Sequence, residues 1–188
     1  MPDPIVERGA DILKKAAADV PKKMFGTKEL NDIIARMSAS CRATEHGVAI
    51  AAPQIGILYR MFVVRGFVMK DMKREDEGAD GEPDVPFINP ALLKVSRKKE
   101  LLEEACLSVP GYFGKVKRAL QATVRASDEN GTHFERGGSG LLAQIFQHET
   151  DHLNGILYVD KAEEVHKAER EEMEAHYEAR EKHKNGKK

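Results

Sequence analysis

The sequence has very few cysteines and no long apolar run. Its 188 residues include two cysteines, Cys41 and Cys106, which are too few for a disulfide framework. In a reducing compartment each remains a thiol unless it binds a metal or takes part in chemistry. No stretch is long and apolar enough to cross a bilayer, and the N-terminus lacks an apolar signal core. We therefore predict a cytoplasmic protein without a membrane partner, with an organellar address left open.

The sequence also lacks an excess of charge of either sign. Lys and Arg number 30 and Asp and Glu 31, which gives a net charge of −1 and a pI near 6.7. This balance argues against a general binder of nucleic acids or membrane surfaces, and we expect no specific DNA partner. With 41% hydrophobic residues, a chain of this length can bury the core of one domain, with or without an appendage.

Apolar residues recur at helical spacing between residues 27 and 44, which predicts an amphipathic helix. Thr27 is a suitable N-cap residue. The buried stripe of this helix would consist of Leu30, Ile33, Ile34, Met37 and Cys41. We therefore expect Cys41 to be a small buried hydrophobe rather than a ligand.

Two more helices are predicted near the C-terminus. One runs from about residue 140 to 154, with Ser139 as candidate N-cap and Gly155 as C-terminal glycine. Asp160 and Glu163 then form a capping-box pattern that opens a long, charged helix towards Lys184. We therefore divide the chain into a main part, residues 1–160, and a charged helical extension of the same domain, residues 161–188.

The remaining segments have strand and loop patterns. Residues 46–56 are small and apolar, which is typical of a close-packed turn or an edge segment. Residues 70–86 are polar and predict a solvated loop. Strands are predicted for residues 60–68, 116–126, 132–136 and 156–159, with a hairpin turn at 128–131 and a break at 137–140.

The strongest chemical signal is the motif QHETDHLNG, residues 147–155. His148 and His152 are four residues apart, so on a helix they lie on one face and can bind one cation. Glu149 follows the first histidine and can lie beside the metal without being a ligand. That position suits a general base for water activated by a metal.

A catalytic metal site of this kind needs a third protein ligand and an open position. From spacing alone the candidates are Cys106 and the carboxylates. Cys106 lies in a short segment between predicted strands and precedes a Val-Pro-Gly turn, an unusual setting for a core cysteine. A site with one cysteine and two histidines could hold iron(II), zinc, nickel or cobalt.

Three segments, in this order, resemble the three signature motifs of the peptide deformylase family. GVAIAAPQ, residues 47–54, is similar to the family's glycine-rich run ending in Ala-Ala-Pro/Thr-Gln. EACLS, residues 104–108, is similar to Glu-Gly-Cys-Leu-Ser, and QHETDHLNG matches Gln-His-Glu-x-x-His followed by Leu-x-Gly. The resemblance covers roughly residues 4–160.

The resemblance implies a fold and a reaction. The fold would be α+β, with antiparallel sheets around a central metal-binding helix, an N-terminal helix and a long C-terminal helix. Residues 1–160 would be the catalytic domain. The enzyme would remove the N-formyl group from the N-terminal methionine of nascent polypeptides and release formate. Its partners would be N-formyl-methionyl peptides, and the basic end at residues 182–188 leaves ribosome docking open.

The resemblance also implies residue roles. Cys106, His148 and His152 would hold one divalent metal ion, natively iron(II), which zinc, nickel or cobalt could replace. Glu149 would be the acid/base that acts on a metal-bound water. Gln54 and the backbone N–H of Leu107 would stabilise the oxyanion formed on the formyl oxygen.

Three residues depart from the family pattern. Ala49 and Ala105 replace glycines of the first and second motifs, and Gln144 stands where an apolar residue commonly lines the methionine pocket. An altered substrate preference is therefore one alternative, in which Gln144 bonds either to the substrate or to a protein partner. We expect the substrate to contact Gly47, Ala49, Ala105, Leu141, Gln144 and Ile145.

Two other functions compete with that of a deformylase. A zinc protease with the H-E-x-x-H motif would take a third ligand downstream, where Glu163, Glu164 and His166 are available. That alternative leaves residues 47–54 and 104–108 unexplained. A non-catalytic metal or peptide binder would lack the base or a ligand, whereas Glu149, Cys106 and both histidines are present.

Overall fold

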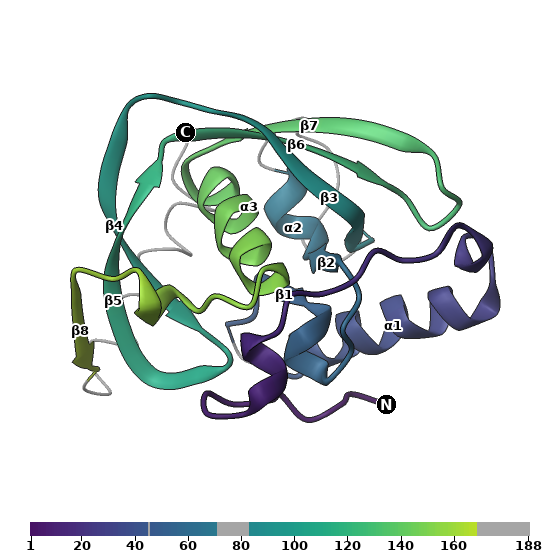
Figure 1. Ribbon diagram of the computed structural model, residues 1–188, viewed down its shortest axis with the longest axis horizontal. Helices are drawn as coiled ribbons and strands as arrows, with labels where there is room; N and C mark the ends of the chain where they lie inside the picture. The colour runs from purple at the N-terminus through teal and green to yellow at the C-terminus, as the bar shows by residue number, and fades with distance from the viewer. Residues whose placement is uncertain (45, 71–82, 169–188) are drawn as a thin grey trace.

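The structure is a computed structural model that describes residues 1–44, 46–70 and 83–168. Helices and antiparallel sheets are combined in it, which confirms the predicted α+β class (Figure 1). None of the helices in these ranges has the length and apolar character needed to span a membrane. The α-helices are α1 (Lys28–Arg42), α2 (Gly66–Lys70) and α3 (Gly140–Leu153), and the 3-10 helices are η1 (Asp11–Lys14), η2 (Lys22–Met24), η3 (Ala52–Ile55) and η4 (Tyr158–Asp160).

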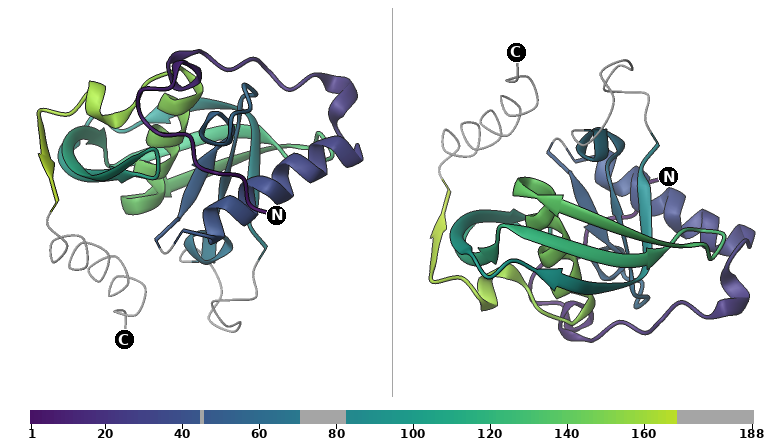
Figure 2. Two further views of the ribbon diagram at one scale, coloured as in Figure 1. Left: turned by 90° about the horizontal axis from the view of Figure 1, so that it is seen from below. Right: turned by 90° about the horizontal axis from the view of Figure 1, so that it is seen from above.

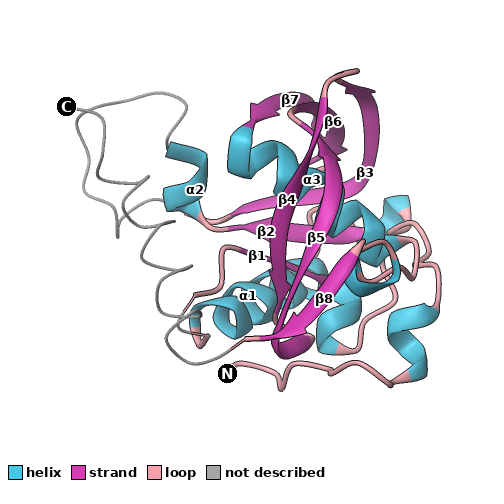
Figure 3. Ribbon diagram, turned by 90° about the vertical axis from the view of Figure 1, so that its left-hand side faces the viewer, coloured by secondary structure: helices cyan, strands magenta, loops and turns pink. Residues whose placement is uncertain are grey.

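The strands form two antiparallel sheets. The first has the order β1-β2-β3-β6-β7 and the second the order β4-β5-β8, whose strands lie side by side in Figure 3. The first consists of β1 (Ala49–Ala51), β2 (Met61–Val64), β3 (Val85–Val95), β6 (Gln121–Ser127) and β7 (His133–Ser139). The second consists of β4 (Lys99–Cys106), β5 (Val109–Ala119) and β8 (Glu164–Lys167).

Strand β2 is buried on both faces. Successive side chains of a strand point to opposite sides. Phe62 and Val64 join the apolar cluster that includes Phe146 of α3, whereas Met61 and Val63 join the cluster beneath α1. The first sheet therefore separates α1 from α3, as the two views in Figure 2 show.

Helix α1 matches its prediction. Thr27 occupies the N-cap, and its side chain accepts a hydrogen bond from the backbone N–H of Leu30 at 3.3 Å. Its apolar stripe faces the sheet, and Cys41 is fully buried in that cluster. Burial raises the pKa of the Cys41 thiol to about 12, so this cysteine is an inert core residue as predicted.

Helix α3 lies between the two sheets, near the centre of Figure 1. It ends just before Gly155, which has a φ of 73° and lies against Lys14 so closely that a Cβ would be 2.5 Å from the Lys14 carbonyl oxygen. Only glycine fits both requirements. Ser139 is at the N-cap position, but its side chain makes no capping bond in this part of the structure.

Several predicted strand limits were wrong. The predicted strand at 60–68 ends at Val64, and α2 follows, with Asp84 accepting a hydrogen bond from the N–H of Gly66 at 3.1 Å. This contact comes from a residue 18 positions away, so local patterns could not indicate it. The predicted glycine-rich break at 137–140 is also wrong, because β7 continues to Ser139. The short strand predicted at 156–159 is replaced by η4.

The strand predicted at 116–126 consists of two strands, because the chain passes from the second sheet to the first at Leu120. The hydroxyl of Ser96 accepts hydrogen bonds from the N–H groups of Leu120 at 3.0 Å and Gln121 at 3.2 Å. Ser96 itself joins β3 of the first sheet to β4 of the second. The hydrogen bonds of Ser96 therefore join the two places where the chain passes between the sheets. Buried and exposed residues continue to alternate from β5 into β6, so the sequence pattern did not indicate the change of sheet.

The predicted opening of the C-terminal helix is also corrected. Residues 164–167 form β8, which pairs with the edge of β5. Glu163 N–H donates to the Lys115 carbonyl and Ala168 N–H to the Gly111 carbonyl, each at 2.9 Å. The unpaired N–H and C=O groups at the edge of β5 therefore bind residues 163–168 as a strand, and this pairing is favoured over a helix that begins at Asp160. The rest of the predicted helix lies outside the described residues, as does most of the predicted 70–86 loop.

Candidate metal centre and substrate pocket

Helix α3 carries three of the predicted site residues within little more than one turn. His148 and His152 lie on one face, with ring centroids 4.9 Å apart. Glu149 and His152 are buried, with 4% and 1% exposed surface. The four-residue spacing therefore has the geometric consequence predicted from the sequence.

The β4–β5 hairpin brings Cys106 to the two histidines. Cys106 Sγ lies 3.2 Å from His152 Nε2, and the ligand atoms of Cys106, His148 and His152 all lie within 4.8 Å of one another. Tetrahedral coordination with bonds of about 2.3 Å to sulfur and 2.0 Å to nitrogen separates such atoms by about 3.5 Å. The donor set therefore fits a divalent metal. Among the described residues, this metal-capable group does not include Glu163, Glu164 or His166.

Glu104 orients His148. Its Oε2 is 2.9 Å from His148 Nδ1, which leaves Nε2 free for the side of the cation site. Arg118 holds the same carboxylate with two bonds, from Nε to Oε1 at 2.7 Å and from Nη2 to Oε2 at 2.9 Å. Arg118 also donates to Asp151 Oδ2 at 2.6 Å, and Lys161 pairs with the other oxygen of Asp151. A buried ionic network thus supports one histidine.

These contacts set the charges around the site. Burial alone would raise the pKa of Glu104, but its bonds to Arg118 and His148 outweigh burial and lower the pKa to about 2. Burial would lower the pKa of His148, but contacts with Cys106 and Glu104 hold it well above its usual range. Burial lowers the pKa of His152 well below its usual range, so that imidazole is neutral. A neutral imidazole is the form that binds metals, so His152 is ready to bind, whereas binding to His148 would release its proton.

Glu149 has the environment of an acid/base. Burial raises the pKa of its carboxyl to about 7. Its Oε2 is buried and has no hydrogen-bond partner among the residues that the structure describes. A buried carboxyl oxygen of this kind needs a partner to offset its lost hydration, and a bound water or substrate group would supply one.

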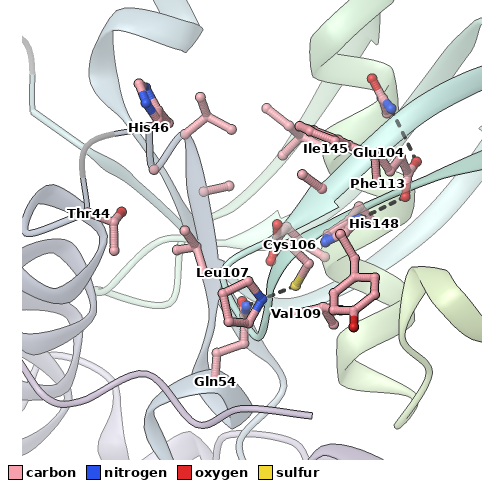
Figure 4. A pocket seen from close by; sticks show the side chains of 18 of the residues that line it. Thr44, His46, Gln54, Glu104, Cys106, Leu107, Val109, Phe113, Ile145 and His148 are labelled. Atoms are coloured by element: carbon pink, nitrogen blue, oxygen red, sulfur yellow. Dashed lines mark hydrogen bonds and ion pairs between the residues drawn. The ribbon is translucent and has the colours of Figure 1, made fainter. Parts of the chain in front are cut away.

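Gln54, at the end of η3, faces the metal ligands from the other wall. Its Oε1 accepts a hydrogen bond from the N–H of Ala51 at 2.8 Å, which fixes the amide with its NH2 group pointing inwards. The Nε2 donates to Ser108 Oγ at 3.1 Å and lies 3.5 Å from Cys106 Sγ (Figure 4). Leu107 follows Cys106 in the hairpin and lines the same pocket as Gln54.

A pocket with a volume of about 280 Å³ opens onto these groups. Cys106, His148, Glu149, Gln54 and Leu107 all line it. The six predicted substrate contacts line it as well: Gly47, Ala49, Ala105, Leu141, Gln144 and Ile145. Three segments far apart in the sequence therefore meet around one cavity, which also has Thr44 and His46 at its rim (Figure 4).

The three departures, Ala49, Ala105 and Gln144, line the pocket together with Gly47, which matches the family pattern. Gly47 has no room for a side chain, because a Cβ would lie 2.3 Å from the Cys41 carbonyl oxygen and from Thr44 Oγ1. Ala49 and Ala105 do line the pocket. The amide of Gln144 turns to protein partners, with Nε2 2.9 Å from the Glu103 carbonyl oxygen and 3.3 Å from Glu104 Oε1. Of the two alternatives for Gln144, bonding to protein is the one observed.

Several residues of the site are not singled out by the sequence patterns. Glu104 stands in the EACLS motif and Arg118 in the strand predicted at 116–126, and the patterns assign no role to either. Aromatic residues Tyr112 and Phe113 also line the pocket. The local signal for Arg118 is a charged residue within a predicted strand. A guanidinium that is buried at such a position needs a charged partner, because an unpaired buried charge costs free energy.

The chain is similar to known proteins over most of its length. The polypeptide deformylase family profile matches residues 2–168. Peptide deformylase 2 of Clostridium acetobutylicum is 38% identical over 150 residues, covering 80% of this chain and 88% of that protein. The chloroplastic peptide deformylase 1A of Solanum lycopersicum is 39% identical over 166 residues, covering 86% of this chain but only 59% of that longer protein.

Solved structures agree with these matches. The crystal structure of a class I type b peptide deformylase from Acinetobacter baumannii with bound Met-Ala-Ser superposes with a TM-score of 0.73. Its sequence is 36% identical, and the match covers 86% of this chain and 98% of that one. Family profile, sequence relatives and fold thus agree over the segment that carries the metal-capable group, and the chain belongs to the polypeptide deformylase family of enzymes.

Proposed function

We propose that this protein removes the N-formyl group from the N-terminal methionine of nascent polypeptides and releases formate. The observation that carries the proposal is the grouping of Cys106, His148 and His152 within 4.8 Å of one another, in a pocket that Glu149 and Gln54 also line. Membership of the deformylase family supports it. The peptide bound to the Acinetobacter baumannii relative supports a peptide as the substrate class.

Cys106, His148 and His152 would hold one divalent metal ion. We propose iron(II) as the native metal and expect zinc, nickel or cobalt to replace it, because one thiolate and two imidazoles suit all four. When bound, the metal would activate water and polarise the formyl carbonyl. The chain's own contribution is to fix the ligands, since Glu104 orients His148 and Arg118 holds Glu104.

Glu149 would move the proton. It follows a ligand directly, its side chain lines the pocket, and its buried Oε2 has no partner among the described residues. A carboxylate placed there can accept a proton from the attacking water and later give it to the amine that leaves the formyl group. Its burial keeps bulk water away from the transferred proton.

Gln54 Nε2 and the N–H of Leu107 would stabilise the negative charge that develops on the formyl oxygen. Both are neutral donors, so they do not compete for an anionic nucleophile. The bond from Ala51 to Gln54 Oε1 holds the donor end of the amide in position before substrate arrives. A preorganised donor of this type contributes roughly 2.7–4 kcal/mol to lowering a barrier.

The methionine side chain would bind against Leu141 and Ile145, with Gly47, Ala49, Ala105 and the stem of Gln144 completing the wall. An altered preference for the first residue remains the alternative function. Residues 1–160 would act as the catalytic domain with 161–188 as its extension. A cytoplasmic location and docking to the ribosome remain predictions from the sequence, with an organelle as the other compartment.

The decisive experiment measures formate release. The protein is loaded anaerobically with iron(II) and given formyl-Met-Ala-Ser, acetyl-Met-Ala-Ser and a formyl amide that is not a peptide. We expect rapid release from formyl-Met-Ala-Ser alone. Cleavage of an internal peptide bond in an unformylated peptide would instead support the protease alternative. No formate release from protein with one bound metal per chain would refute the proposal.

A further inference from the structure

The N-terminal strap, residues 3–10, contacts both segments that carry the proposed oxyanion donors. The N–H of Val6 donates to the carbonyl oxygen of Gln54 at 2.8 Å. Two residues later, the N–H of Arg8 donates to the carbonyl oxygen of Ser108 at 2.7 Å. Gln54 supplies one proposed donor from its side chain, and Ser108 is joined by its peptide bond to Leu107, which supplies the other.

The strap sets a spacing between these two segments. Val6 and Arg8 are two residues apart, and two residues of backbone span at most about 7 Å. The Gln54 and Ser108 carbonyls are therefore held by one short piece of backbone that cannot stretch much. A direct bond from Gln54 Nε2 to Ser108 Oγ at 3.1 Å joins the same two segments from inside the pocket.

The strap is fastened at both ends. Asp3 N–H donates to Ser40 Oγ at 2.8 Å, that hydroxyl donates to the Asp3 carbonyl at 3.0 Å, and Arg36 pairs with the Asp3 carboxylate at 2.8 Å. These partners lie on α1. Beyond the strap, Leu13 is buried at 1% exposure and the N–H of Ala17 donates to the carbonyl of Leu153, at the end of α3. The strap is thus anchored rather than frayed.

We infer that the N-terminal strap is a positioning element that fixes the two oxyanion donors relative to each other through the backbone N–H groups of Val6 and Arg8. This role rests on the proposed function. Neither side chain is needed for it, and the side chain of Arg8 is exposed. Motif searches along the sequence cannot find such a role, because it belongs to the backbone.

The turn at the end of the strap makes a sharp test possible. Ala10 N–H donates to the Glu7 carbonyl at 3.3 Å, and Gly9 has a φ of 111°. This pattern is that of a type II turn with Arg8 at its second position, where proline is favoured. Arg8→Pro is therefore compatible with the turn but removes the N–H that donates to the Ser108 carbonyl. The ring Cδ takes the place of that hydrogen, so the strap and Ser108 must also move apart.

Two matched variants accompany Arg8→Pro. Arg8→Ala removes the exposed side chain and keeps the N–H. Glu7→Pro places the same ring one position earlier, where the N–H donates no hydrogen bond within the described residues, and keeps the N–H groups of Val6 and Arg8. Zinc-loaded forms of all variants are checked for one metal per chain and for cooperative thermal unfolding.

We expect Arg8→Pro to lower kcat on formyl-Met-Ala-Ser about tenfold, part of the 10²–10³ lost when such a donor is deleted. KM should stay within about twofold, because the donors act on the charge of the transition state. Arg8→Ala and Glu7→Pro should keep kcat within about twofold of the parent. A folded, metal-loaded Arg8→Pro with the parent's kcat would overturn the inference.

A second measurement does not depend on activity. In the zinc-loaded parent, hydrogen exchange followed by NMR should be slower at the amides of Val6 and Arg8 than at Glu7. The Leu107 amide and Gln54 side-chain amide signals should shift in Arg8→Pro and not in Arg8→Ala. Unprotected strap amides in the parent would refute the strap's role even if Arg8→Pro did not fold. Unshifted donor signals in a folded Arg8→Pro would refute it as well. A parent without deformylase activity would refute the proposed function instead.

Discussion

The two sides of helix α3 contact the rest of the protein through different kinds of interaction. One side packs into the first sheet through apolar contacts, where Phe146 lies against the stacked pair of Phe62 and Phe87, whose ring centroids are 4.7 Å apart. The other side meets the β4–β5 hairpin through charges. That side consists of Gln144, His148 and Asp151 from α3 with Glu104 and Arg118 from the hairpin.

The difference shows how each side tolerates change. The stability that comes from apolar packing is the sum of many small contact energies. A substitution that conserves side-chain volume therefore lowers the free energy of unfolding only a little. In the ionic network each member satisfies its neighbours, so removing one leaves a buried charge without a partner. The apolar side therefore fixes where α3 lies, and the ionic side fixes how His148 points. The following variants test that division, beginning with the largest expected effect.

Replacing a metal ligand should have the largest effect. Cys106→Ala should abolish stoichiometric metal binding and turnover, because two imidazoles alone bind a divalent ion weakly. Cys41→Ala is the matched control, since Cys41 lies in the apolar cluster beneath α1. Metal content by mass spectrometry and formate release measure both. A Cys106→Ala protein that keeps one tightly bound metal and full turnover would remove Cys106 from the ligand set.

Glu149→Gln should lower kcat by about 10²–10⁴ while the metal and the fold remain, because it removes proton transfer and little else. Steady-state kinetics on formyl-Met-Ala-Ser, together with metal content and circular dichroism, distinguish this from a folding defect. Turnover within a few-fold of the parent would mean that another group is the base.

Arg118→Met tests the ionic side against the apolar side. It removes the guanidinium that joins Glu104 to Asp151 and leaves only His148 beside Glu104 and only Lys161 beside Asp151. We therefore expect a loss of about 3–5 kcal/mol in the free energy of unfolding. Leu142→Met, on the apolar side of α3, should lower the free energy of unfolding by less than about 1.5 kcal/mol. Urea unfolding of the metal-free proteins gives both values. Equal costs would contradict the division between the two sides.

Gln144→Ile should have the smallest effect on chemistry. Because the Gln144 amide bonds to Glu103 and Glu104, we expect a stability loss of about 1 kcal/mol and an unchanged ranking of substrates. The measurement is kcat/KM for formyl-Met, formyl-norleucine and formyl-Gln peptides on both proteins. If the substitution changed the ranking, Gln144 would set specificity and the altered-preference alternative would gain support.

The sequence predicted the elements that follow local rules. Helices α1 and α3 were expected within a few residues of their observed ends, because their periodicity and end signals are local. The metal-capable group was also expected, since a four-residue helical spacing and a family motif specify it. Elements that depend on distant partners were wrong: α2 is capped by Asp84, and β8 pairs with the free edge of β5.

The sequence by itself therefore determined which side chains are available and that His148 and His152 share a helix face, because helical geometry fixes their spacing. It also determined, through its motifs, the family to which the chain belongs. Only the tertiary structure decided which partners Glu104, Arg118, Gln144 and the strap have. Their partners are separated from them by many residues, and a hydrogen bond between distant segments exists only after the sheets and α3 have packed.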